Sequence, residues 1–148
     1  MSHDSGPTAF FSKTYDEAYA LLIEARNYVA YEEAGDRAAL SDFGRMSVSL
    51  ETMRLTTRVT EIMAWLLYQK AVHAGEMSLE EALSQDCRLD RNHVCLGGAQ
   101  TEVLPRRLGE LMSRSRKLYL RVMRLDELLV RDTEPPRIAD LWPGDDRD

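Results

Sequence analysis

Apolar residues recur at helical spacing along residues 41–74, where they form two separate stripes. The first stripe contains Val48, Leu55, Val59, Ile62 and Leu66, and the second stripe contains Met46, Leu50, Met53, Ala64, Leu67 and Ala71. Two apolar stripes on one helix predict that it is covered on two sides. We expect this helix to run from about Ser41 to Ala74 and to end at Gly75, with a length of about 50 Å.

The end of this helix, with the sequence IMAWLLY, is apolar all round. Its large residues are Ile62, Met63, Trp65, Leu66, Leu67 and Tyr68. Such a segment is expected deep in a helical bundle or in a subunit interface. Three helices need not cover it completely, so it also predicts a homodimer.

Two further long helices flank the central one. The first is expected to start at Thr14, because Thr14 and Glu17 match the pattern of a capping box, and to end at Gly35. The last is expected from about Glu102 to Arg131, with Pro105 in its first turn. Its inward residues lie three and four apart: Leu108, Leu111, Ser115, Leu118, Val122, Leu125 and Leu129.

The connection between the second and third long helices begins with another capping box, Ser78 and Glu81, which predicts a short helix to about Gln85. Residues 87–100 show no clear period and are expected to be a loop. The sequence therefore predicts an all-α, antiparallel three-helix bundle with a long central helix. The expected divisions are a flexible leader at 1–11, the bundle domain at 12–131 and a disordered acidic tail at 132–148.

The net charge and the length of the apolar runs argue against nucleic acid and membranes as partners. The chain of 148 residues has a net charge of −6, which gives no overall attraction for nucleic acid or an anionic membrane. Its longest apolar run, Ile62–Tyr68, is far shorter than the roughly 20 residues of a membrane-spanning helix. The N-terminal residues lack the features of a secretory signal, so we expect a cytoplasmic protein with free thiols at Cys87 and Cys95.

The third helix carries a basic stripe, which we define as Arg107, Arg114, Lys117, Arg121 and Arg124. Residues 102–131 contain eight basic and four acidic residues, a local charge of +4 in an acidic protein. The stripe has two open interpretations: a solvated face that complements the acidic first helix and tail, or a docking face for an acidic protein. DNA binding is a weaker interpretation, because neither a helix-turn-helix spacing nor interleaved aromatic residues are present.

The acidic tail contains one apolar cluster, formed by Ile138, Leu141 and Trp142. An exposed tryptophan in a polar tail is costly unless it binds something. The cluster is expected either to fold back on the bundle of its own chain or to bind a partner, with Trp142 as the anchor.

Candidate chemistry is sparse. Cys87, His93 and Cys95 can ligate metals, but their spacing is not that of a zinc site, so structural or incidental roles are favoured. The sequence lacks a nucleophile elbow, a phosphate-binding glycine loop and a zinc-protease helix motif. We therefore expect a protein that is not an enzyme and that needs no cofactor.

Residues 49–78, with 11–18, 116–119 and 124–127, resemble the RcdA family of alphaproteobacteria, the regulators of CtrA degradation. This resemblance implies a three-helix bundle, a homodimer and an adaptor role. The implied partners are a ClpXP-type protease with its unfoldase, a response regulator and protein cargo of the cell cycle. Two alternatives stay open: a DNA-associated regulator that uses the basic helix, and a metal-dependent sensor or enzyme.

Overall fold

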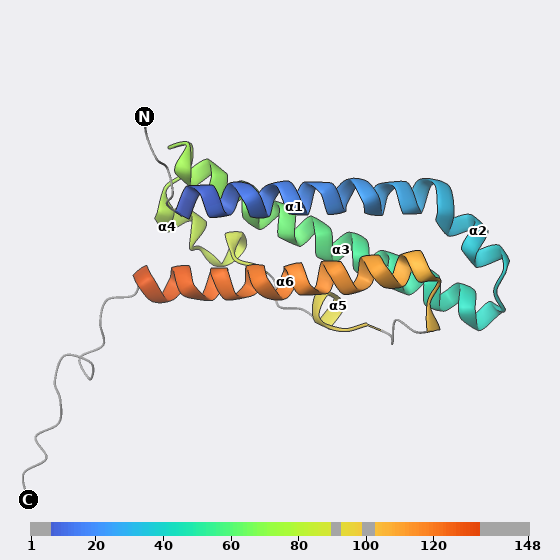
Figure 1. Ribbon diagram of the computed structural model, residues 1–148. Coiled ribbons are helices and arrows are strands. Elements are labelled where there is room, and N and C mark those ends of the chain that lie inside the picture. Colours follow the sequence, from blue (N-terminus) through green and yellow to red (C-terminus); the bar gives the residue numbers. More distant parts are fainter. Residues whose placement is uncertain (1–6, 90–92, 99–102, 134–148) are drawn as a thin grey trace, which may run out of the picture.

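The computed structural model describes residues 7–89, 93–98 and 103–133, and in these ranges it is built of helices without strands. Three long helices dominate: α1 (Pro7–Asn27), α3 (Asp42–His73) and α6 (Arg106–Thr133). A π-helical turn (Tyr28–Glu32) joins α1 to α2 (Glu33–Ala38). The expected all-α bundle with a long central helix is confirmed (Figure 1).

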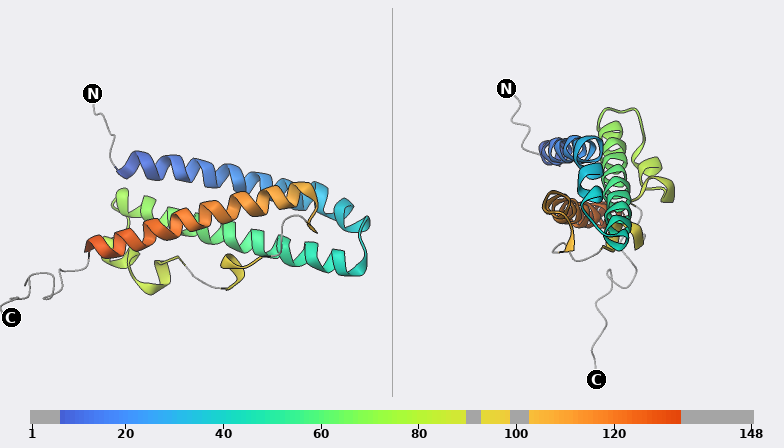
Figure 2. Two further views of the ribbon diagram at one scale, coloured as in Figure 1. Left: turned by 60° about the horizontal axis from the view of Figure 1, so that its bottom comes forward. Right: turned by 90° about the vertical axis from the view of Figure 1, so that its right-hand side faces the viewer.

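The helix α1 runs antiparallel to both α3 and α6, whereas α3 and α6 run in the same direction (Figure 1). This parallel pair is possible because the connection between them travels back along the bundle. It contains α4 (Leu79–Ala82), a 3-10 turn (Gln85–Cys87) and α5 (His93–Leu96). In the end-on view, α3 lies between this connection and the other two long helices (Figure 2).

Several helix ends follow the predicted local chemistry. The Ser41 hydroxyl accepts a hydrogen bond from the Gly44 amide at the start of α3, and Ser78 does the same for Glu81 at the start of α4. After α3, Gly75 has a φ of +74°, which favours glycine, and it ends the helix as expected.

Other predicted boundaries are wrong. The first helix starts at Pro7 instead of Thr14, which lies two turns inside α1 with its side chain buried. Gly35 does not end a helix but lies within α2, because the chain passes through the π-helical turn without stopping. The short helix α4 stops at Ala82, and the expected loop over 87–100 contains α5.

The core lies where the first stripe of α3 meets α1 and α6. Val48, Leu55, Val59 and Ile62 are all at most 1% exposed. The inward row of α6 is buried as predicted over Leu108, Leu111, Ser115, Leu118 and Val122, while Leu125 and Leu129 are partly buried. The bundle is therefore closed by one apolar face from each long helix.

The second stripe of α3 is largely exposed in the single chain, so only one of the two predicted sides of this helix is covered by the described residues. Met46, Leu50, Met53 and Leu67 are 60%, 52%, 63% and 48% exposed. Within the IMAWLLY segment, Ile62, Trp65 and Leu66 are buried, whereas Met63 and Tyr68 are intermediate. One side of the segment faces the core, and Leu67 faces outward.

Candidate docking surface

The basic stripe lies on the outer side of α6 because the inner side of that helix is occupied by the buried apolar row. Arg114, Lys117, Arg121 and Arg124 are exposed, and Arg107 is partly exposed. Residues three and four apart share one face of a helix, so burial of the leucine row turns these cations together toward solvent and α1.

Acidic residues of α1 pair with part of the basic stripe. Glu24 accepts hydrogen bonds from Arg107 at 3.1 Å and from Arg114 at 2.5 Å. Two turns further toward the start of α1, Glu17 pairs with Arg121 at 2.6 Å. These contacts support the interpretation that the stripe complements the acidic first helix.

The environment of Glu24 stabilises its charged form. The hydrogen bond from Arg114 lowers the pKa of this carboxyl below its usual value of 4.5, and Arg107 adds to the lowering, while burial opposes it. Reciprocally, the bond to Glu24 raises the pKa of Arg114. Ion pairs between charged side chains therefore link α1 to α6 across the surface of the bundle.

Two members of the stripe are left for other partners. Within the part of the chain that the structure describes, Lys117 and Arg124 make no ion pair, and both are exposed. They sit on the same stretch of α6 as the paired residues Arg114 and Arg121. Their charges are not neutralised by α1.

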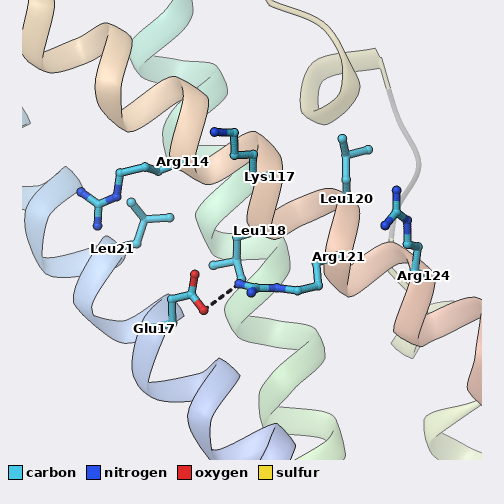
Figure 3. Close-up of a pocket in the computed structure, with 8 residues that line it drawn as sticks. All are labelled: Glu17, Leu21, Arg114, Lys117, Leu118, Leu120, Arg121 and Arg124. Atoms are coloured by element: carbon cyan, nitrogen blue, oxygen red, sulfur yellow. Dashed lines mark ion pairs between the residues drawn. The ribbon is translucent and has the colours of Figure 1, made fainter.

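These residues border a groove between α1 and α6, which we call the α1–α6 groove (Figure 3). Its volume is about 490 Å³. The lining consists of Glu17 and Leu21 from α1 with Arg114, Lys117, Leu118, Leu120, Arg121 and Arg124 from α6. Leucines beside a cationic rim are suited to a peptide segment that carries both acidic and apolar side chains.

The sequence did not predict the role of one buried arginine of α3. Arg58 is 1% exposed and donates hydrogen bonds to the carbonyls of Cys95 at 2.9 Å, Gly97 at 3.0 Å and Met112 at 3.1 Å. It also donates to the Ser115 hydroxyl at 2.9 Å. Burial lowers the pKa of Arg58. The sequence places Arg58 among the inward residues Leu55, Val59 and Ile62, and a buried charge at such a position needs hydrogen-bond partners inside the protein.

A second buried polar contact holds the start of the connection. The Asp126 carboxylate of α6 accepts from the Trp65 indole at 3.0 Å and from Arg88 at 3.0 Å. Trp65 is thus both a core residue and a hydrogen-bond donor, which suits an indole with one polar edge. Arg58 and Asp126 together attach the connection to α3 and α6.

The cysteines take part in this packing. Cys95 is fully buried in α5, Cys87 is partly buried in the 3-10 turn, and both are free thiols. His93 is the first residue of α5. In the described ranges, no group of three His, Cys, Asp or Glu residues is placed to hold a metal ion.

Ile138, Leu141 and Trp142, the predicted tail anchor, lie outside the described residues. Among the residues that the structure does describe, no helix is long and apolar enough to cross a membrane.

The comparisons with known proteins concern nearly the whole chain. A family model described as "Protein of unknown function (DUF1465)" matches residues 4–141. No curated protein matches the chain. Among solved structures, the crystal structure of RcdA from Caulobacter crescentus CB15 is similar, with 33% sequence identity and a TM-score of 0.67. That match covers 80% of this chain and 89% of the RcdA chain.

Proposed function

Because this chain belongs to the RcdA family, we propose that it is a non-enzymatic adaptor for regulated proteolysis. It brings protein cargo, or a response-regulator partner, to a ClpXP-type protease during cell-cycle control. The likeness to RcdA over most of both chains is the observation that carries this proposal. An adaptor of this kind works in the cytoplasm and needs neither a cofactor nor a metal.

The α1–α6 groove is the proposed docking site for an acidic partner. Its support comes from Lys117 and Arg124, two exposed cations without an ion pair to the described chain. Arg107, Arg114 and Arg121 hold α1 in place through Glu17 and Glu24 and so shape the same groove. The two interpretations of the basic stripe thus apply to different members of it.

A charge reversal tests this site. Lys117→Glu with Arg124→Glu leaves the ion pairs to α1 intact, so it should weaken partner recovery about tenfold while leaving the fold unchanged. Recovery is measured by pull-down from cell extract with quantification of protease subunits, response regulators and cargo. Lys13→Glu with Arg26→Glu is the matched control, because both residues are exposed, lie outside the groove and give the same change in net charge.

The outcomes separate the adaptor role from the docking site. Wild-type protein that recovers neither protease components nor a response regulator contradicts the adaptor proposal. Equal recovery by the wild type and the Lys117–Arg124 double variant contradicts the groove as the docking site but does not contradict the adaptor role. Binding to DNA that weakens steeply with added salt would favour the DNA-associated alternative.

The homodimer is a second part of the proposal. We propose that a second copy covers the second stripe of α3, where Met46, Leu50, Met53 and Leu67 are exposed. Phe43, which is 79% exposed, extends this surface toward the start of α3. Several exposed large apolar side chains along one helix are typical of a protein–protein contact.

A further inference from the structure

A cavity with a largely apolar lining is formed by residues near the start of α1 and near the ends of α3 and α6. These three helix ends lie at the same end of the bundle (Figure 1). We call this cavity the end cavity. Its volume is about 410 Å³, and its apolar wall includes Phe11, Tyr15, Leu66, Val72, Leu79 and Leu129. Among these, Leu79 is 42% exposed, so part of the wall is open to solvent.

The rim of the end cavity carries one basic and one acidic side chain. Lys70 of α3 and Asp16 of α1 contribute to the lining, as does His73. The Lys70 ammonium lies 4.6 Å from the centre of the Tyr15 ring. An apolar cavity with an ammonium group at its edge favours an apolar ligand that is attached to a carboxylate.

The chain itself contains such a ligand close by. Residues 132–148 hold six acidic and two basic residues, and within them lie Ile138, Leu141 and Trp142. Their spacing of three and four in the sequence is that of residues on one face of a helix. The tail therefore combines one apolar face with a strongly acidic context.

The end of α6, from which the tail continues, lies next to the end cavity. Leu129 lines the end cavity and stands one helical turn before Thr133, the last described residue of α6. Pro135 and Pro136 oppose a longer helix. Trp142 follows Thr133 by nine residues, which at about 3.3 Å each span up to about 30 Å, ample to turn back to the cavity.

We propose that the Ile138–Trp142 segment docks in the end cavity of its own chain. The indole of Trp142 fills the space between α1, α3 and the start of α4, and an acidic residue of the tail meets the Lys70 ammonium at the rim. A docked tail withholds its only tryptophan from other proteins. This inference rests on the end cavity and the tail and does not depend on the adaptor function.

Acrylamide quenching of Trp142 in the full chain tests the proposal. The Trp142 contribution is obtained by subtracting the fluorescence of Trp142→Phe, which leaves only Trp65, a residue that is 1% exposed. Docking predicts a shielded indole in the wild type. Leu79→Glu places a charge in the cavity wall and should raise the quenching constant of Trp142 about threefold, toward that of an exposed indole.

Leu128→Glu is the matched control, because Leu128 is 49% exposed, close to Leu79 at 42%, and does not line the end cavity. It should leave the quenching constant unchanged. A wild-type indole already quenched like a free one overturns the proposal, as does equal shielding in the wild type and Leu79→Glu.

Methyl NMR locates the docked indole. Comparison of the full chain with its Trp142→Ala variant should shift the methyl signals of Val72, Leu79 and Leu129 and leave those of Leu21 and Leu118 unchanged. Shifts at Leu21 and Leu118 instead would place the tail in the α1–α6 groove and overturn the end cavity as its site. Shifts that vanish on dilution would mean docking on a second copy, which also contradicts the proposal.

Discussion

At the scale of single residues, two polar side chains decide how the connection is attached. Arg58 satisfies three backbone carbonyls and one hydroxyl from a position inside the core. A buried charge with this many partners both satisfies its own hydrogen-bonding needs and immobilises the segment that provides the carbonyls. Asp126 plays the equivalent role with Trp65 and Arg88.

Replacing Arg58 tests this role. Arg58→Ala should lower the free energy of unfolding by about 3 kcal/mol, because it leaves buried carbonyls without donors and creates a cavity. Arg54→Ala is the comparison, since Arg54 also bonds the connection, at the Val94 carbonyl, but is only partly buried. Urea unfolding at equilibrium measures both variants, and equal losses would contradict a special role for Arg58.

The lowered pKa of Glu24 predicts how stability depends on pH. A carboxyl whose pKa is lower in the folded chain binds its proton more weakly there than in the unfolded chain. Its stabilising effect is present above the usual value of 4.5 and is lost as the pH falls through the lower, folded value. Below about pH 4.5, the melting temperature should therefore fall less steeply with decreasing pH in Glu24→Gln than in the wild type.

Thermal unfolding between about pH 6 and pH 3 measures this slope. Asp16→Asn serves as the control, because Asp16 is exposed on α1 and makes no ion pair to the described chain. Identical profiles for the wild type and Glu24→Gln would show that the ion pairs of Glu24 with Arg107 and Arg114 do not make the stability depend on pH.

At the scale of elements, the path from α1 to α2 shows how a helix can bend without stopping. The π-helical turn at Tyr28–Glu32 changes the direction of the chain while its backbone remains hydrogen-bonded. The buried Tyr28 side chain secures the bend, because its hydroxyl donates to Asp36 of α2 at 2.8 Å. Burial and the neighbouring Asp36 carboxylate both raise the pKa of Tyr28, so this donor stays protonated.

Two glycines distinguish a helix interior from a helix end. Gly35 lies within α2, has no positive φ, and an added Cβ would meet no atom within 4 Å. Gly35→Ala should therefore stabilise the fold by about 0.5–1 kcal/mol. Gly75 has a φ of +74°, so Gly75→Ala should destabilise it by about 1 kcal/mol. Opposite shifts in the melting temperature are expected, and a loss of stability in Gly35→Ala would contradict the helical position of Gly35.

At the scale of the whole molecule, one surface of the long central helix is left uncovered. The first stripe of α3 meets α1 and α6, which together bury one side of the helix. Met46, Leu50 and Met53 of the second stripe stay exposed together, and Leu67 is exposed further along the helix. A monomer would leave these apolar side chains in water, which supports the proposed dimer.

Leu50→Glu tests the dimer. A charge in the centre of the second stripe should convert the protein to a monomer at micromolar concentration, as measured by light scattering. Leu128→Glu is the control, because Leu128 of α6 is 49% exposed and Leu50 is 52% exposed. A monomeric wild type would contradict the dimer, and a dimeric Leu50→Glu would place the interface elsewhere.

The sequence by itself determined the long helices and most of their inner faces, because these depend on neighbours three and four residues apart. Local chemistry also predicted the caps at Ser41 and Ser78 and the helix end at Gly75. The start at Thr14 and the end at Gly35 were wrong for a physical reason. Capping residues and glycine are tolerated inside a helix when packing on both sides of them continues.

Only the tertiary structure decided which faces meet. Arg58 and Met112 are 54 residues apart, and Glu24 and Arg114 are 90 residues apart, so no local pattern pairs them. The parallel course of α3 and α6 follows from the returning connection, for which the sequence predicted a short helix and a loop but no direction. The division of the basic stripe into paired arginines and two cations without an ion pair to the described residues likewise depends on where α1 places Glu17 and Glu24.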